Sequence, residues 1–287
     1  MNTRSRVLLA ALSLMVIAVY LGVSAPPPLP EEIETPRTDA RIPVDTVFRI
    51  LAHENDAART LYTQRIVGPG LKVGLAFSED WQRDGVTAGP LPALFLRRSA
   101  ERLVRSGSPI GLFLGSDKPI SPSNLFEGEQ ARRFETIRET REPEFFLDPD
   151  TQMYTAMFPD IAATRPCVSC HNEHPDSPRT DWALGDVMGA TTWILPRASY
   201  TTDEALELVT ALRGSFRGTY GEYLDEYERA EPTTGGSPLP TVGTGWPGDP
   251  DTDDPITLPD VETFLTACEE AASRETLRHM LAATRGD

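Results

Sequence analysis

Two cysteines and a histidine that lie close together in the sequence are the residues best suited to chemistry. Cys167, Cys170 and His171 form the pattern C-x-x-C-H, which is typical of covalent attachment of c-type haem. Two thiols three positions apart can each add to one vinyl group of the same porphyrin, and the adjacent imidazole can supply an axial nitrogen to the iron. The motif therefore predicts one covalently bound haem c, with His171 as its proximal ligand.

The same residues permit two other kinds of chemistry. A zinc ion could bind Cys167, Cys170 and His174, although no second Cys or His pair lies nearby at zinc-finger spacing. A dithiol–disulfide couple also uses C-x-x-C, but it normally begins a helix in a thioredoxin-like βαβ unit, which the sequence does not predict. Haem attachment is favoured over both.

The second axial position of the iron separates electron transfer from ligand binding. A His or Met in that position favours electron transfer, whereas an open position favours ligand binding or catalysis. His53 and Met188 are the candidate distal ligands, but an ordinary, partly exposed histidine and a core methionine are the stronger interpretations. We expect Met188 to share its strand face with Ala190 and Thr192. The sequence does not choose a distal ligand.

Several other side chains could serve a haem pocket. Arg165 and Arg179 flank the motif and could pair with haem propionates, although solvated surface charge is the stronger interpretation. Cys268 is best explained as a buried residue of the last helix, with an intermolecular disulfide as the alternative. Aromatic residues that could wall a pocket, or simply pack in the core, are Phe145, Phe146, Tyr154, Phe158, Trp182 and Trp193.

The first 25 residues predict the compartment. Arg4 and Arg6 precede an uncharged, mostly apolar run of 19 residues, Val7 to Ala25, and about 20 such residues span a bilayer as a helix. Positive charge before the run places the N-terminus inside and the remainder outside. A cleaved signal peptide is the alternative, but the prolines that begin at Pro26 disfavour cleavage. We expect a single-pass inner-membrane anchor with the haem domain in the periplasm.

Hydrophobic periodicity predicts an α+β domain in which helices flank a central antiparallel sheet. The expected helices cover residues 43–68, 92–104, 128–139 and 203–228, and the expected strands 110–114, 144–147, 153–158 and 186–195. The predicted organisation is an anchor or signal segment over 1–25, a tether over 26–42, the haem domain over 43–229, a disordered acidic linker rich in Pro and Gly over 230–259, and a C-terminal amphipathic helix over 260–287.

Charge and motifs exclude several classes of function. The 287-residue chain has a net charge of -16, which argues against a nucleic-acid partner because phosphate contacts need clustered Lys and Arg. The sequence contains no nucleophile elbow and no Walker loop. With no recognisable catalytic His/Arg pair either, a non-enzymatic role is favoured.

The segment from Pro166 to Pro178, PCVSCHNEHPDSP, followed by Asp181-Trp182, resembles a family of extracytoplasmic c-type haem-binding domains with a PAS-like fold. The resemblance covers about residues 45–200. It implies redox or small-ligand sensing, since the domain often stands before a cytoplasmic kinase, cyclase or chemoreceptor module. Nothing after Ala230 is similar to a kinase or cyclase, so a partner protein would have to pass on the signal. A monohaem electron-transfer protein is the alternative, and a haem enzyme such as a peroxidase is the third possibility.

Overall fold

The computed structural model describes Met15 and residues 41–163, 165–229, 241–248 and 257–285. The predicted anchor over 1–25 lies outside the described residues apart from Met15, and so does the predicted tether apart from residues 41 and 42. Within the described part of the chain, no helix combines the length and the apolar composition that a membrane crossing needs.

Helices and strands mix along the chain, which confirms the predicted α+β class. The helices are α2 (Val44–Leu61), the π-helical turn η1 (Tyr62–Val67), α3 (Gly68–Lys72), α4 (Pro92–Arg105), the 3-10 turn η2 (Pro122–Asn124), α5 (Gly128–Thr140), α6 (Arg165–Glu173), α7 (Thr202–Arg229) and α8 (Val261–Arg285). The strands are β1 (Ile42–Pro43), β2 (Phe77–Ser78), β3 (Gly89–Pro90), β4 (Gly111–Gly115), β5 (Glu144–Leu147), β6 (Tyr154–Ile161), β7 (Val187–Leu195), β8 (Ser199–Tyr200), β9 (Thr241–Gly243) and β10 (Thr257–Pro259).

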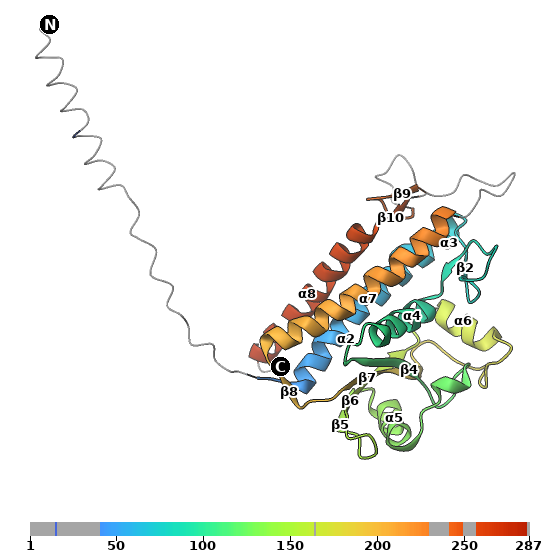
Figure 1. Cartoon of the computed structure of the whole chain (residues 1–287). Coiled ribbons are helices and arrows are strands. Elements are labelled where there is room, and N and C mark those ends of the chain that lie inside the picture. Colours follow the sequence, from blue (N-terminus) through green and yellow to red (C-terminus); the bar gives the residue numbers. More distant parts are fainter. Residues whose placement is uncertain (1–14, 16–40, 164, 230–240, 249–256, 286–287) are drawn as a thin grey trace, which may run out of the picture. The chain divides into compact units, whose positions relative to one another are not determined.

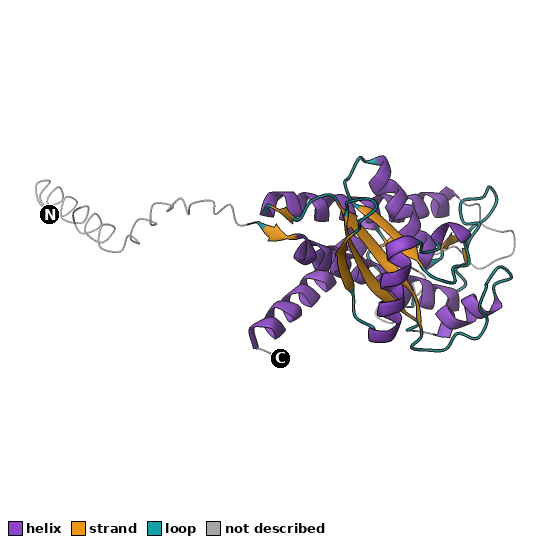
Figure 2. Cartoon of the chain, turned by 90° about the horizontal axis from the view of Figure 1, so that it is seen from below, coloured by secondary structure: helices purple, strands orange, loops and turns teal. Residues whose placement is uncertain are grey.

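A four-stranded antiparallel sheet with the order β4-β7-β6-β5 stands at the centre, and β5 and β6 form the predicted hairpin. Helices cover both faces of this sheet (Figure 2). Trp193 and Ala156 belong to the main core, which the sheet shares with α2, α4, α7 and α8. On the other face, Met157 and Ala190 pack with Phe134 of α5. The alternation of side chains along the strands therefore supplies both cores.

Three long helices, α2, α7 and α8, lie side by side (Figure 1). α8 runs antiparallel to α2, because the Phe264 ring lies 6.5 Å from that of Tyr62 while Thr276 Oγ1 lies 3.3 Å from His53 Nδ1. Tyr62 also stacks on Phe95 of α4, with 4.5 Å between the ring centroids. Large buried aromatic side chains thus join the helices, and burial of each contributes about 2 kcal/mol.

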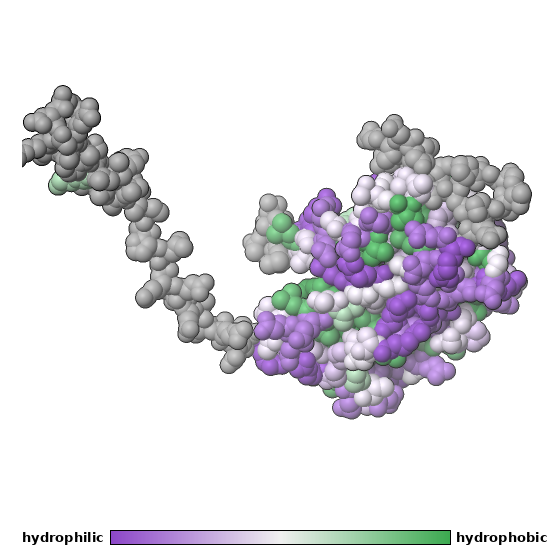
Figure 3. Space-filling view, turned by 45° about the horizontal axis from the view of Figure 1, so that its top comes forward, coloured by the Kyte–Doolittle hydropathy of each residue, from purple (hydrophilic) through white to green (hydrophobic). Residues whose placement is uncertain are grey.

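The surface outside these cores is mainly polar. Hydrophilic side chains cover most of the face seen in Figure 3, and hydrophobic ones form small patches between them. The described chain therefore keeps most of its large apolar side chains in the interior, as the hydrophobic effect requires.

The prediction of a disordered linker over 230–259 is corrected for residues 241–248 and 257–259, which the structure describes. β9 and β10 pair in parallel, and the Trp246 ring lies under the guanidinium of Arg65, 4.9 Å from its centroid. The amino-acid composition predicts disorder here, but it does not reveal contacts that are made with residues far away in the sequence.

The predicted C-terminal helix over 260–287 is present as α8, but it is not a separate unit. Its residues Phe264, Leu265 and Cys268 are buried in the main core. The described residues from Arg41 onward belong to one compact unit, and the last helix completes its main core.

The first helix extends beyond its predicted end at Gly68-Pro69-Gly70. Through η1 and α3 it reaches Lys72. In η1 the hydrogen bonds span five residues, so the N–H of Gly68 donates to the carbonyl oxygen of Thr63. Pro69 then falls in the first turn of α3, where a missing N–H is tolerated.

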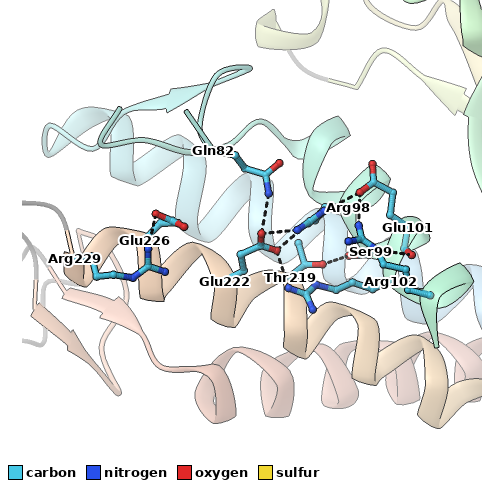
Figure 4. Close-up of polar contacts among 10 residues, drawn as sticks. Gln82, Arg98, Ser99, Glu101, Arg102, Thr219, Glu222, Glu226 and Arg229 are labelled. Atoms are coloured by element: carbon cyan, nitrogen blue, oxygen red, sulfur yellow. Dashed lines mark hydrogen bonds and ion pairs between the residues drawn. The ribbon is translucent and has the colours of Figure 1, made fainter. Parts of the chain in front are cut away.

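Polar contacts between α4 and α7 are concentrated on Glu222 (Figure 4). Its carboxylate accepts hydrogen bonds from Arg98 at 2.6 and 2.8 Å, from Arg102 at 2.7 Å and from Gln82 at 2.8 Å. Desolvation acts to raise the pKa of Glu222, but the two guanidinium groups outweigh it and lower the pKa from 4.5 to about 2.

This lowered pKa predicts how stability depends on pH. The Glu222 carboxylate binds a proton less tightly in the folded state than in the unfolded state. The stability that ionised Glu222 contributes is therefore present above pH 4.5 and is lost as the pH falls toward 2. We expect Glu222→Gln to lower the free energy of unfolding at neutral pH. In this variant the free energy should also fall less steeply between pH 4.5 and 2 than in the wild type, as measured by urea unfolding at several pH values. Glu226→Gln is the control, since Glu226 pairs at the surface with Arg229 of its own helix. If the free energy of unfolding fell equally steeply with pH in the wild type and in Glu222→Gln, the lowered pKa of Glu222 would be contradicted.

Candidate haem attachment site

The C-x-x-C-H motif lies on α6, in the connection between the adjacent strands β6 and β7. Cys167, Cys170 and His171 occupy positions i, i+3 and i+4 of this helix, so they project from one face. Cys170 is exposed, whereas Cys167 and His171 are half-buried. The structure therefore brings the three predicted attachment residues together on a short helix at one end of the central sheet.

The loop after α6 is held against the motif by Asn172. Its side-chain oxygen accepts from the backbone N–H of Trp182 at 2.8 Å, and its side-chain nitrogen donates to the Trp182 carbonyl at 3.0 Å. The edge-to-face contact between Trp182 and His171 has 6.4 Å between ring centroids. Asn172 thus fixes the indole, and the indole in turn limits the orientation of the His171 ring.

The environment of His171 suits a metal ligand. Desolvation lowers the pKa of His171, while the charge of Asp160 opposes this shift, so the neutral imidazole that metals bind is favoured at pH 7. Its Nδ1 atom is buried and has no hydrogen-bond partner among the residues that the structure describes, which is costly for a polar atom unless another group satisfies it. The residues present therefore fit an iron-bearing group held at this ring.

The environment of Cys170 does not favour a reactive thiolate. Desolvation raises the pKa of its thiol, and the negative charge of Glu79 raises it further. Redox-active cysteines of C-x-x-C motifs instead have lowered pKa values. This direction disfavours the dithiol interpretation of the motif.

An arginine of α2 reaches the end of β6 that leads into the motif. Arg59 Nη2 lies 3.0 and 3.2 Å from the two oxygens of Asp160, and Nη1 lies 3.3 Å from Thr191 Oγ1. Arg59 also interacts electrostatically with Cys167 and with Asp56. Desolvation raises the pKa of Asp56 to about 6, against the opposing charge of Arg59.

Sequence reasoning missed these three charged residues, Asp56, Arg59 and Asp160. The spacing of Asp56 and Arg59 on one helix is a local signal. Their partner Asp160 is 101 positions from Arg59, so only the fold brings it to them.

Met188 lies next to the motif, on a face that differs from the predicted one. The β6–β7 register shifts between Asp160 and Ile161, and Met188 is the unpaired residue of β7. Such a bulge moves a side chain to the other face of its strand. Met188 consequently packs with Trp182 against Cys167, rather than with Ala190 in the α5 core.

The remaining histidines and aromatic residues have other surroundings. His53 Nδ1 lies 3.3 Å from Thr276 Oγ1 of α8, so part of its ring faces that helix. His174 accepts a hydrogen bond from the Asp176 N–H at 3.1 Å, which is the local polar contact expected of it. Apart from Trp182, the aromatic candidates belong to or pack against the two sheet cores: Phe145, Phe146, Tyr154, Phe158 and Trp193.

Further predicted residues can also be placed. Arg179 forms ion pairs with Asp181 at 2.7 Å and Asp186 at 3.1 Å, and its guanidinium lies 3.9 Å from the Trp182 ring centroid. Cys268 is buried in the main core, as predicted. Among the residues that the structure describes, no three His, Cys, Asp or Glu side chains gather as a metal-binding group.

An α+β domain that presents C-x-x-C-H on one helix face, with a buried histidine nitrogen that finds no partner within the described part of the chain, has the features of a cytochrome c-type haem domain. The chain matches the Tll0287-like family model, described as Tll0287, over residues 37–196. It belongs to this family, which is of the cytochrome c type. No curated protein and no solved structure matched the chain. The matched segment includes the sheet and α6, whereas α7 and α8 lie beyond it.

Proposed function

We propose that this chain is a periplasmic monohaem c-type protein, anchored in the inner membrane, whose haem is attached to Cys167 and Cys170 with His171 as proximal ligand. The observation that carries the proposal is the common face of these residues on α6, together with the buried Nδ1 of His171, to which no described residue offers a hydrogen bond. Family membership supports the cofactor. When bound, haem supplies an iron that can change oxidation state or take a small ligand.

The protein's own residues have distinct roles in this proposal. Cys167 and Cys170 fix the cofactor, and His171 holds its imidazole in the neutral form. Asn172 and Trp182 orient that imidazole, as the two backbone hydrogen bonds and the ring contact indicate.

The proposed role is redox or small-ligand sensing through a partner protein. It is supported by the resemblance to PAS-like haem domains and by an antiparallel sheet whose first strand, β4, lies beside its last, β7. Helices on both faces of the sheet agree with that fold.

Covalent attachment is tested with variants of the three cysteines. We expect the wild-type chain, made in cells with the c-type maturation machinery, to keep haem on a denaturing gel and to give a pyridine haemochrome spectrum of one haem c. The double variant Cys167→Ala/Cys170→Ala should lose all covalent haem, because no thioether can form. Cys268→Ala is the matched control and should retain it, since Cys268 lies in the main core. A wild-type chain without covalent haem would refute the proposal.

The distal ligand is tested separately. Met188 packs beside Cys167, which gives the electron-transfer alternative a specific candidate. If the protein senses a small ligand, we expect the reduced wild type to bind carbon monoxide, because such sensing requires an iron position that is open or easily vacated. If the wild type does not bind it and Met188→Leu or His53→Ala does, the electron carrier is favoured and the ligand is identified.

A further inference from the structure

A pocket lies beside Trp182, the residue whose ring contacts His171 of the motif. Its volume is about 320 Å³, and Trp182 and Val187 form its apolar lining. The polar lining consists of Asp117, Lys118, Arg138, Arg141, Arg179 and Asp186. A pocket of this size is at the lower end of the range for small-molecule sites.

The pocket is positively charged, in contrast to the chain as a whole. Its lining has four cationic side chains and two carboxylates, whereas the protein carries a net charge of -16. Asp117 pairs with Arg138, and Asp186 pairs with Arg179. Such a local reversal of sign attracts anions to a surface that otherwise repels them.

Two cations of this lining, Lys118 and Arg141, remain unmatched. Within the described part of the chain, neither has a carboxylate within ion-pair distance. Arg141 Nη2 donates instead to the carbonyl oxygen of Gly185 at 2.5 Å, which leaves the other donors of its guanidinium for a ligand.

The backbone at Arg141 also points to a functional role. Arg141 ends α5 with φ 65° and ψ 14°, in the left-handed conformation. Glycine is the usual residue at such a helix end, because a Cβ is sterically disfavoured there. An arginine that keeps this conformation places its guanidinium at the pocket at the expense of stability.

We propose that this pocket binds a small dianion, such as phosphate or a short dicarboxylate, through Lys118 and Arg141. Arg138 and Arg179, which are already paired with carboxylates, contribute further positive charge. Because Trp182 forms part of the lining and contacts the His171 ring, a bound anion lies one side chain away from the proposed axial ligand. The effect on haem rests on the proposed function, whereas anion binding itself does not.

The site is tested by isothermal titration calorimetry of the full chain with inorganic phosphate and with succinate, at about 0.15 M ionic strength. We expect saturable binding of at least one of them. Lys118→Gln and Arg141→Gly should each weaken it about tenfold, the loss of one charge-assisted contact. Arg141→Gly also suits the left-handed backbone, so this variant should remain folded. Arg132→Gln, which removes an exposed charge of the same helix that is paired with Glu129, should leave binding unchanged.

Two outcomes would overturn the proposal. One is the absence of binding to the wild type, or binding that Lys118→Gln and Arg141→Gly do not weaken. The other is binding only to the haem-free variant Cys167→Ala/Cys170→Ala, which would mean that the haem's own carboxylates occupy the pocket. If binding occurs in the haem-loaded protein, a lowered reduction potential on adding the anion is expected, because nearby negative charge stabilises ferric iron. Calorimetry would still report the site if no haem were attached, so failure of the two proposals can be distinguished.

Discussion

Replacing Glu54 with alanine is expected to lower the free energy of unfolding by about 3 kcal/mol. Glu54 lies on α2 and is 7% exposed. Its two carboxylate oxygens accept hydrogen bonds from Arg213 of α7 at 2.7 and 2.8 Å. Removing the carboxylate leaves a partly buried guanidinium without its bidentate partner, which costs more than the loss of a surface ion pair.

The matched control is Glu269→Ala. Glu269 is the other carboxylate near Arg213, at 3.3 Å, but its side chain is 51% exposed. Its removal should cost less than about 0.5 kcal/mol. Both variants are compared by urea unfolding at neutral pH, with the slope as a check on two-state behaviour. If the two variants lost the same free energy of unfolding, burial would not strengthen the ion pair between Glu54 and Arg213.

Gly189→Ala is expected to destabilise the protein by about 3 kcal/mol, at the upper end for overpacking by one methyl group. A Cβ at Gly189 would lie 2.4 Å from the carbonyl oxygen of Gly115. Both residues belong to the central sheet, in β7 and β4, so the backbone has little freedom to move. The neighbouring hydrogen bond from Ser116 Oγ to the Met188 carbonyl, 2.6 Å long, should be strained as well.

Gly214→Ala is the control, and we expect it to raise stability where Gly189→Ala lowers it. Gly214 lies within α7, and a Cβ there meets nothing within 4 Å. Alanine should stabilise this helix by about 1 kcal/mol, because glycine loses more backbone entropy on folding. Thermal unfolding of both variants tests the pair. A Gly189→Ala protein as stable as wild type would mean that β4 and β7 can separate at this point without cost.

The sequence predicted the parts of the fold that local patterns determine. The predicted ranges 92–104, 144–147 and 186–195 each identified an element close to its observed bounds, namely α4, β5 and β7. α7 runs unbroken for 28 residues although it contains Gly214, Gly218 and Gly221, a residue type that destabilises helices. A Cβ at position 218 would lie 2.9 Å from Arg102 Nη1. Gly218 therefore makes room for the Arg102 guanidinium.

The candidate site was predicted only as far as the motif itself. The pattern C-x-x-C-H identified three residues because its spacing is local. The face of Met188 was predicted wrongly, since strict alternation does not foresee a bulge at Asp160–Ile161. The pairing of Arg59 with Asp160 depends on how α2 crosses the sheet, which one sequence does not reveal.

The contact between α2 and α8 has a consequence for the order of events in folding. His53 and Thr276 are 223 positions apart in the chain, yet they lie side by side. Contacts between such distant residues form late, because a long loop must close before they are gained. During synthesis α8 is also the last of these elements to emerge. In the proposed c-type protein, the helix that carries Cys167 and Cys170 would therefore be accessible while the core is still open, when an attachment enzyme could reach both thiols.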